Sequence, residues 1–228
     1  MKIKNGDFIE FDFVGRIKST NDIFDLTIKE VSKKEGLHRE GMQYKPLVAC
    51  VGKGDILKGL DEFLVDKETG KEYDVEVPPE KGYGKRDNKL MQLVPINKFR
   101  EQNINPFPGL QVTINNIPGI IKTVSGGRVI VDFNHPLSGR DLIYSIKIIS
   151  IVTDEKKKVN GVLRNYFGFE DEKVEVEKET VTLHKKVNEN IKEKIRQKLK
   201  EAMPSLKEVK FEKEEPKTEN KPKIEKKE

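Results

Sequence analysis

The feature that most constrains the fold is a repeated alternation of apolar and polar residues with a period of two. Ile9, Phe11 and Phe13 alternate with Glu10 and Asp12, which places one face of a β-strand on a core. The same pattern predicts strands over residues 8–17, 47–51, 72–77, 111–115, 119–124, 128–133 and 142–152. Helical segments between them are short. We therefore expect an α+β fold with antiparallel pairing rather than alternating βαβ units.

Two short helices are expected among these strands. Leu57, Leu60, Phe63 and Leu64 fall at helical spacing and predict one amphipathic helix, and residues 97–102 predict a second. The charged stretch over residues 26–45 is expected to be a surface bulge.

The C-terminal part predicts a small β-α-β unit. Residues 173–183 alternate as a strand, residues 185–203 form a helix that Pro204 ends, and residues 208–211 are a last strand. One helix stripe is apolar: Val187, Ile191, Ile195 and Leu199. Burial of so few large apolar side chains cannot offset the entropy lost when the unit becomes ordered. We therefore expect the stripe to be buried against another chain or another domain, and self-association is the favoured form.

Charge and composition restrict the partners. Charged residues make up 36% of the chain and the net charge is only +5, without the excess of one sign that phosphate binding requires, so no nucleic-acid partner is expected. Apolar residues are concentrated in residues 3–152. Residues 212–228 are almost entirely Lys, Glu and Pro and are predicted to be disordered.

The cysteine and histidine residues give no support for a metal site or a cofactor. Cys50 is the only cysteine, and His38, His135 and His184 are far apart in the sequence. No segment has the length of a signal peptide or a membrane span, so a cytoplasmic protein with no membrane partner is expected. The density of Lys and Glu suits a heat-adapted organism.

Two catalytic motifs can be rejected. Residues 54–59 are spaced like a phosphate-binding loop, but Leu60 follows where that loop needs Lys and then Ser or Thr. No Gly-x-Ser-x-Gly sequence marks a hydrolase nucleophile.

Four further motifs occur in a specific order. Residues 12–16 read DFVGR, residues 23–25 read IFD, residues 51–60 read VGKGDILKGL, and residues 75–84 read VEVPPEKGYG. In content and order they resemble the FKBP-type peptidyl-prolyl cis/trans isomerases, over residues 2–152. That resemblance implies an antiparallel half-barrel sheet around a short helix.

The residues after Gly84 are similar to one branch of this family. About fifty residues intervene before the last strand and close with VIVDFNHPLSG over residues 129–139, which resembles the inserted flap of SlyD-like proteins, here of the archaeal long type with a C-terminal extension. The expected domains are an isomerase domain (residues 1–84 and 135–153), a flap (85–134), the C-terminal β-α-β domain (154–211) and a charged tail (212–228).

The resemblance also implies a prolyl site, and residues 1–153 alone are expected to catalyse. The Leu57 N–H and the Tyr83 hydroxyl would bond substrate carbonyls, while Asp25 faces the reacting carbonyl. Around them the pocket would be lined by Phe13, Phe24, Leu47, Ile56, Leu60 and Tyr144. Leu60 stands where the family usually has Trp, and Leu47 where it has an aromatic residue, which makes macrolide binding more doubtful than catalysis.

The flap is expected to bind unfolded polypeptide, because it is richer in large apolar residues than a surface loop. These residues are Leu90, Met91, Leu93, Phe99, Ile104, Phe107, Ile117 and Ile120, some of which must form the flap's own core. The chain would then be an isomerase and ATP-independent chaperone, with unfolded proteins and proline-containing peptides as partners. Two alternatives are a holdase with a weak or inactive pocket, and a homodimeric or ribosome-associated factor built on the C-terminal domain.

Overall fold

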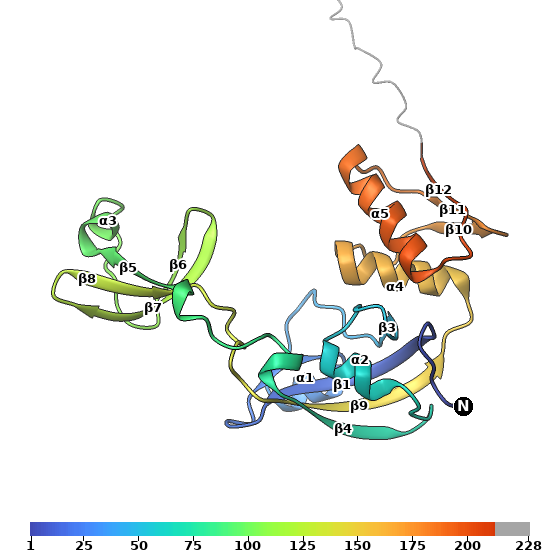
Figure 1. Ribbon diagram of the computed structural model, residues 1–228, viewed down its shortest axis with the longest axis horizontal. Helices are drawn as coiled ribbons and strands as arrows, with labels where there is room; N and C mark the ends of the chain where they lie inside the picture. The colour runs from blue at the N-terminus through green and yellow to red at the C-terminus, as the bar shows by residue number, and fades with distance from the viewer. Residues whose placement is uncertain (213–228) are drawn as a thin grey trace, which may run out of the picture.

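The computed structural model describes residues 1–212, so the predicted tail lies outside the described residues except for Glu212. Figure 1 shows three bodies: a central sheet, a flap joined to it by two extended segments, and a C-terminal unit stacked on the central body. Among residues 1–212, no helix combines the length and the apolar character that crossing a membrane requires.

The central body is an antiparallel sheet that curves around one helix. Its strands are β1 (Phe8–Ile17), β2 (Ile23–Leu26), β3 (Leu47–Cys50), β4 (Glu72–Val77) and β9 (Leu142–Ile151). They lie in the order β2-β1-β9-β4, and β3 pairs with β1. Helix α2 (Lys58–Leu64) packs Leu60 and Leu64 into the core of this sheet. The predicted α+β class with antiparallel pairing is confirmed.

The connections around this sheet contain short helices. The expected bulge after β2 contains α1 (Lys29–Lys34), and a 3-10 turn, η1 (Pro79–Lys81), follows β4. The Gly59 backbone lets α2 approach β4 closely, since a Cβ there would lie 2.8 Å from a methyl carbon of Val77.

The flap has its own four-stranded sheet and its own core. After η2 (Asn88–Leu90) come β5 (Met91–Pro95), α3 (Ile96–Arg100), β6 (Gln111–Ile114), β7 (Ile117–Ser125) and β8 (Arg128–Asp132). The strands lie in the order β5-β8-β7-β6 around a buried cluster of Phe99, Ile121, Val129 and Val131. Strand β5 was not predicted, because its alternation is short and ends in Pro95.

The C-terminal unit is larger than the predicted β-α-β unit. It comprises α4 (Glu155–Phe167), β10 (Val174–Glu177), β11 (Thr180–Leu183), α5 (Glu189–Ala202) and β12 (Glu208–Phe211). Strands β11 and β12 pair in parallel across α5, as a β-α-β unit requires, but α4 precedes it. The predicted strand over residues 173–183 is a hairpin that turns at Lys178, which has φ of +54°.

The expected seam for self-association is not present on α5. Ile195 and Leu199 are 0% and 1% exposed, and Val187 and Ile191 pack against the same cluster. That cluster contains Val159, Val162 and Leu163 of α4, the helix that the sequence reading missed, and it extends to Phe8, Val48, Cys50 and Val152. The stripe is therefore buried inside the chain, against α4 and residues of the central body, which is the expected burial against another domain rather than self-association.

Candidate active site on the central sheet

Three aromatic rings lie together on the face of the sheet that α2 covers. Phe13 of β1 and Tyr144 of β9 have ring centroids 5.7 Å apart, and Phe24 of β2 meets Tyr144 edge-on at 5.6 Å and 82°. Gly15 makes this packing feasible: a Cβ there would lie 2.7 Å from the Phe24 ring and 3.1 Å from that of Tyr144. Because Gly15 has no side chain, the rings of Phe24 and Tyr144 can pack directly against the β1 backbone.

The apolar and tyrosine side chains expected at the site all join one hydrophobic cluster. Phe13, Leu60 and Tyr144 are buried in it, and Phe24, Leu47, Ile56, Leu57 and Tyr83 pack against it partly buried. Asp25 adjoins this cluster, because it follows Phe24 on β2 and its charge acts on both Tyr83 and Tyr144.

The loop between β3 and α2 brings Ile56 and Leu57 to the site. The Asp61 carboxylate accepts hydrogen bonds from the Gly52 and Gly54 N–H groups at 2.7 and 3.1 Å, so α2 holds the first part of this loop. Leu57 is the N-cap residue of α2, with φ of −55°. Among the described residues its N–H donates no hydrogen bond, which leaves it available to a ligand carbonyl.

Asp25 is an exposed residue of β2 that borders the site. Loss of hydration raises the pKa of Asp25, and two weaker effects oppose this: a hydrogen bond of 2.9 Å from the Leu26 N–H and the positive charge of Arg164. Arg164 belongs to α4, so the C-terminal unit contributes to the electrostatics of the site.

Tyr83 is held by residues that follow the flap. Its ring stacks on the His135 imidazole with centroids 4.4 Å apart, and its carbonyl accepts a hydrogen bond of 2.9 Å from the Ser138 hydroxyl. Burial raises the pKa of Tyr83, and that of Tyr144 much more, so both hydroxyls stay protonated and can donate. His135 and Ser138 belong to the NHPLSG motif, but nothing in the sequence indicated that they contact Tyr83.

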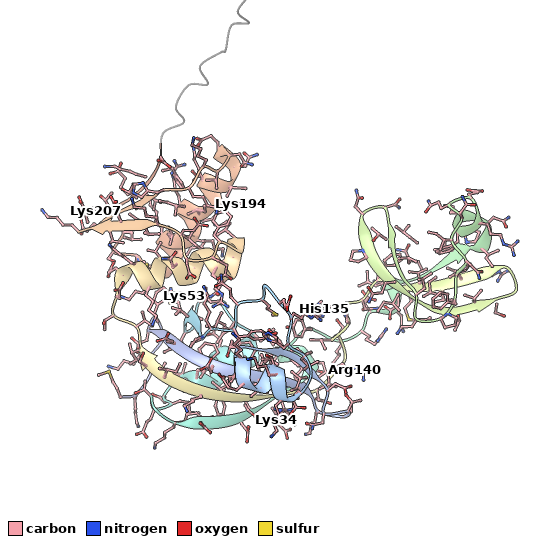
Figure 2. The ribbon with its side chains drawn as sticks, turned by 180° about the vertical axis from the view of Figure 1, so that it is seen from behind. Lys34, Lys53, His135, Arg140, Lys194 and Lys207 are labelled. Atoms are coloured by element: carbon pink, nitrogen blue, oxygen red, sulfur yellow. The ribbon has the colours of Figure 1, made fainter. Side chains whose placement is uncertain are left out.

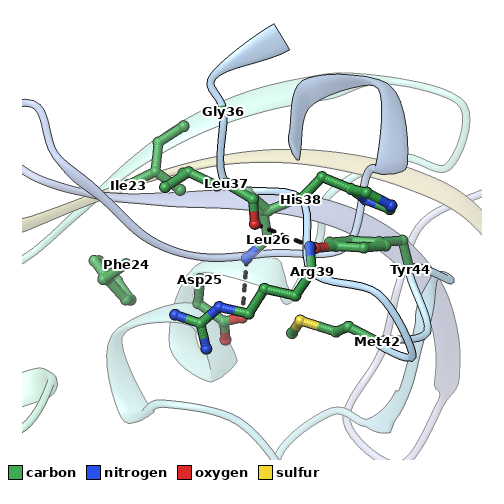
Figure 3. Close-up of a pocket in the computed structure, with 10 residues that line it drawn as sticks. All are labelled: Ile23, Phe24, Asp25, Leu26, Gly36, Leu37, His38, Arg39, Met42 and Tyr44. Carbon is green, nitrogen blue, oxygen red and sulfur yellow. Dashed lines mark hydrogen bonds between the residues drawn. The ribbon is translucent and has the colours of Figure 1, made fainter. Parts of the chain in front are cut away.

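A cavity of about 300 Å³ lies beside Asp25 and extends the site toward the bulge (Figure 3). Phe24 and Asp25 line it together with bulge residues that sequence reasoning did not single out, among them Leu37, His38, Arg39, Met42 and Tyr44. The Tyr44 hydroxyl accepts a hydrogen bond from the Arg39 N–H and donates one to the Leu37 carbonyl. These contacts order a loop whose charged sequence gives no periodic signal.

The flap residues expected to bind polypeptide divide into exposed and buried members. Leu90, Met91, Leu93, Phe107 and Ile117 are 38% to 57% exposed. Phe99 is 4% exposed and belongs to the flap core, so its expected role in binding is wrong, and Ile104 packs against that core. Ile120 and Ile117 line a groove of about 490 Å³ that also includes Phe133, His135 and Pro136.

The arrangement suits a reaction without covalent chemistry. An X-Pro amide rotates slowly because of its partial double-bond character, and that character is lost at the twisted transition state. An apolar pocket that binds the twisted amide more tightly than the planar one lowers the barrier. No group of His, Cys, Asp or Glu among residues 1–212 has the geometry of a metal site. The sheet, the helix and this pocket are the ones expected of an isomerase of prolyl bonds.

Comparisons with known proteins identify the family. The family model described as FKBP-type peptidyl-prolyl cis-trans isomerase matches residues 1–99, and the one described as FKBP26, IF domain, matches residues 92–137. The chain is 33% identical over 155 residues to the short-type peptidyl-prolyl cis-trans isomerase of Methanocaldococcus jannaschii, a match that covers 68% of this chain and 98% of that relative. The chain belongs to the FKBP-type peptidyl-prolyl cis-trans isomerases.

Two bacterial relatives support the same assignment. The chain is 31% identical over 111 residues to a probable FKBP-type 16 kDa isomerase of Pseudomonas fluorescens, covering 46% of this chain and 73% of the relative. It is 30% identical over 109 residues to the isomerase SlyD of Haemophilus influenzae, covering 46% of this chain and 57% of that protein. The SlyD-like character of the sequence is therefore confirmed.

Proposed function

We propose that this isomerase acts on unfolded protein chains that its flap binds, as an ATP-independent chaperone. In this proposal residues 1–84 and 135–153 form the isomerase domain, residues 85–134 the polypeptide-binding flap and residues 154–211 the C-terminal domain. One observation carries the proposal: the apolar groove of the flap includes His135, and the ring of His135 stacks on Tyr83. A chain bound in the groove would thus lie next to the prolyl site.

The distribution of exposed apolar side chains supports a binding role for the flap. Within the described residues, large exposed apolar side chains outside the flap are Met1, Leu37, Met42 and Ile149. The flap alone carries Leu90, Met91, Leu93, Phe107 and Ile117. Apolar surface gathered on one small body attracts unfolded chains, and holding such a chain raises the local concentration of its prolines at the pocket.

In the pocket, we assign the substrate contacts as follows. The Leu57 N–H and the Tyr83 hydroxyl donate hydrogen bonds to substrate carbonyls, and Asp25 faces the carbonyl of the rotating bond. The proline ring packs against Phe13, Leu60 and Tyr144, with Phe24, Leu47 and Ile56 around it. The Leu57 N–H, which has no partner within residues 1–212, and the protonated Tyr83 hydroxyl favour this assignment.

The alternative is a holdase whose prolyl pocket is weakly active or inactive. Its support is the same flap surface, since binding alone requires no pocket. The packed pocket and the contact between His135 and Tyr83 favour an isomerase that uses the flap.

Other expectations from the sequence stay predictions. A cytoplasmic location rests on apolar segment lengths, an archaeal source on the resemblance to the long type, and heat adaptation and the absence of a nucleic-acid partner on composition. A homodimer through the C-terminal domain no longer has the α5 stripe as support, because Ile195 and Leu199 are buried inside the chain.

The test compares a short substrate with a protein substrate. Phe107→Ser with Ile117→Ser should leave kcat/KM on a proline tetrapeptide unchanged and lower the rate of a proline-limited refolding reaction by about tenfold or more. Ile149→Ser, an exposed apolar residue of β9, is the matched control and should change neither rate. Equal refolding rates for the double variant and the native chain would refute the role of the flap.

A further inference from the structure

The C-terminal unit is packed directly on the isomerase body at β3. Gly161, in the middle of α4, lies so close to β3 that a Cβ there would be 2.8 Å from a methyl carbon of Val48 and 3.0 Å from its carbonyl oxygen. Val159, Val162 and Leu163 share one buried cluster with Val48. The two bodies are thus joined by a continuous apolar core.

Three consecutive side chains of α4 reach from this contact toward the prolyl site. Arg164 donates a hydrogen bond of 3.1 Å to the Pro46 carbonyl, and Asn165 one of 2.9 Å to the Val48 carbonyl. The Tyr166 hydroxyl donates one of 2.6 Å to the Asp55 carboxylate. Arg164 binds the residue just before β3, Asn165 binds β3 itself, and Tyr166 binds the loop that follows β3.

Asp55 connects α4 to the end of the loop that carries Leu57. One oxygen of its carboxylate accepts from Tyr166, and the other accepts a hydrogen bond of 2.9 Å from the Cys50 N–H. Asp55 is two residues before Leu57, whose N–H is unpaired among the described residues. The loop over residues 52–57 therefore has two carboxylate anchors: Asp61 on α2, and Asp55, which Tyr166 and the Cys50 N–H hold together.

The surroundings of Tyr166 keep it in the donor form. Burial raises the pKa of Tyr166, so the phenol stays protonated. The Lys198 ammonium lies 4.7 Å from the centre of the ring, so the ring is held by contacts independent of the hydroxyl. Figure 2 shows Lys53, in the same loop, between the isomerase body and the C-terminal unit.

We infer that Tyr166 is a positioning residue for the isomerase reaction: its hydrogen bond to Asp55 fixes the loop over residues 52–57, and with it the Leu57 N–H. The inference rests on the proposed role of that N–H. It gives the C-terminal domain a supporting role in catalysis by the pocket of residues 1–153. A proline bond twisting in the pocket needs its donor at a fixed position, so a looser loop would reduce kcat more than it raises KM.

The experiment removes one hydroxyl from the full chain. Tyr166→Phe keeps the ring and should lower kcat/KM on a proline tetrapeptide by about three- to tenfold, mostly in kcat, with little change in melting temperature. Amide hydrogen exchange at Ile56 and Leu57 should become faster. Lys157→Gln is the matched control, since it removes the 2.7 Å contact of α4 with Glu10 but does not touch the loop. It should change neither the kinetics nor the exchange.

Two further variants separate the steps of the inference. In an Asp55→Ala background, Tyr166→Phe should have no additional effect on kcat, because the two residues act through one hydrogen bond. Leu57→Pro deletes the N–H, and its φ of −55° suits proline. If Leu57→Pro keeps full activity while Tyr166→Phe loses it, the donor assignment is wrong, and Tyr166 acts on catalysis through the loop over residues 52–57 but not through that N–H. If Tyr166→Phe keeps native kcat and loop exchange, the inference is overturned.

Discussion

The imidazole of His135 stacks on the phenol ring of Tyr83, with ring planes 1° apart. His135 lies in the segment that returns from the flap, so this contact joins the flap to a residue of the prolyl pocket. Figure 2 places His135 where the central body meets the segments that lead to the flap.

Removing this stack should weaken catalysis without unfolding the protein. An aromatic pair contributes about 0.5–1.5 kcal/mol, so His135→Ala should lower kcat/KM on a tetrapeptide by about two- to tenfold. His135→Phe restores a ring and should recover most of the activity. If His135→Ala retains native kinetics, the stack has no role in holding Tyr83.

Arg164 gives a prediction for the pH dependence. Its charge lowers the pKa of Asp25, opposing the dehydration that raises it. Arg164→Gln removes this cation, so the pKa of Asp25 should rise and its carboxyl should be protonated at a higher pH than in the native chain. The acid limb of the profile of kcat/KM against pH should then move to higher pH.

The control for that profile is Arg164→Lys, which keeps the charge and should leave the acid limb in place. An acid limb that is identical in Arg164→Gln and the native chain would show that the charge of Arg164 does not affect the pKa of Asp25.

The α5 stripe provides a test of packing. Ile195 is 0% exposed, and an unpaired carboxylate in that position should cost about 3–5 kcal/mol of the free energy of unfolding. Ile195→Asp should therefore lower the melting temperature of the chain. Lys194→Asp, at the neighbouring exposed position, is the control and should have little effect. A native melting temperature together with a halved mass in light scattering would instead favour the intermolecular seam.

The elements predicted well are those whose apolar pattern is long and regular. The alternation over residues 8–17 coincides with β1, and that over residues 142–152 with β9 to within one residue. Both strands bury one face on a large core, so sequence pattern and tertiary packing agree. The eight apolar and tyrosine residues of the expected prolyl site also fall in one cluster.

The C-terminal unit shows why other parts were missed. Lys156, Lys157 and Lys158 make the start of α4 look like a solvated charge run, although two signals were present. Asp154 caps the helix by accepting from the Lys157 N–H, and Gly168 ends it at φ of +64°. Without α4, the sequence pattern underestimates the apolar area of the unit, which favours self-association over burial of the α5 stripe against another domain.

Long-range contacts of single side chains have no signature in the sequence. The hydrogen bond between Tyr166 and Asp55 joins residues 111 positions apart, and the stack of His135 on Tyr83 spans the whole flap. Such pairs follow from how domains dock, which local periodicity does not encode.

The central claim, that prolyl bonds turn over at the cluster around Asp25 and Tyr83, is tested most directly by kcat/KM on a proline tetrapeptide for two single variants. Asp25→Ala and Tyr83→Phe should each lower it by about tenfold or more, at an unchanged free energy of unfolding. Asp22→Ala and Tyr73→Phe are the matched controls, because Asp22 is exposed beside β2 and the Tyr73 hydroxyl bonds Glu68 instead. Native kinetics in both site variants would contradict the account.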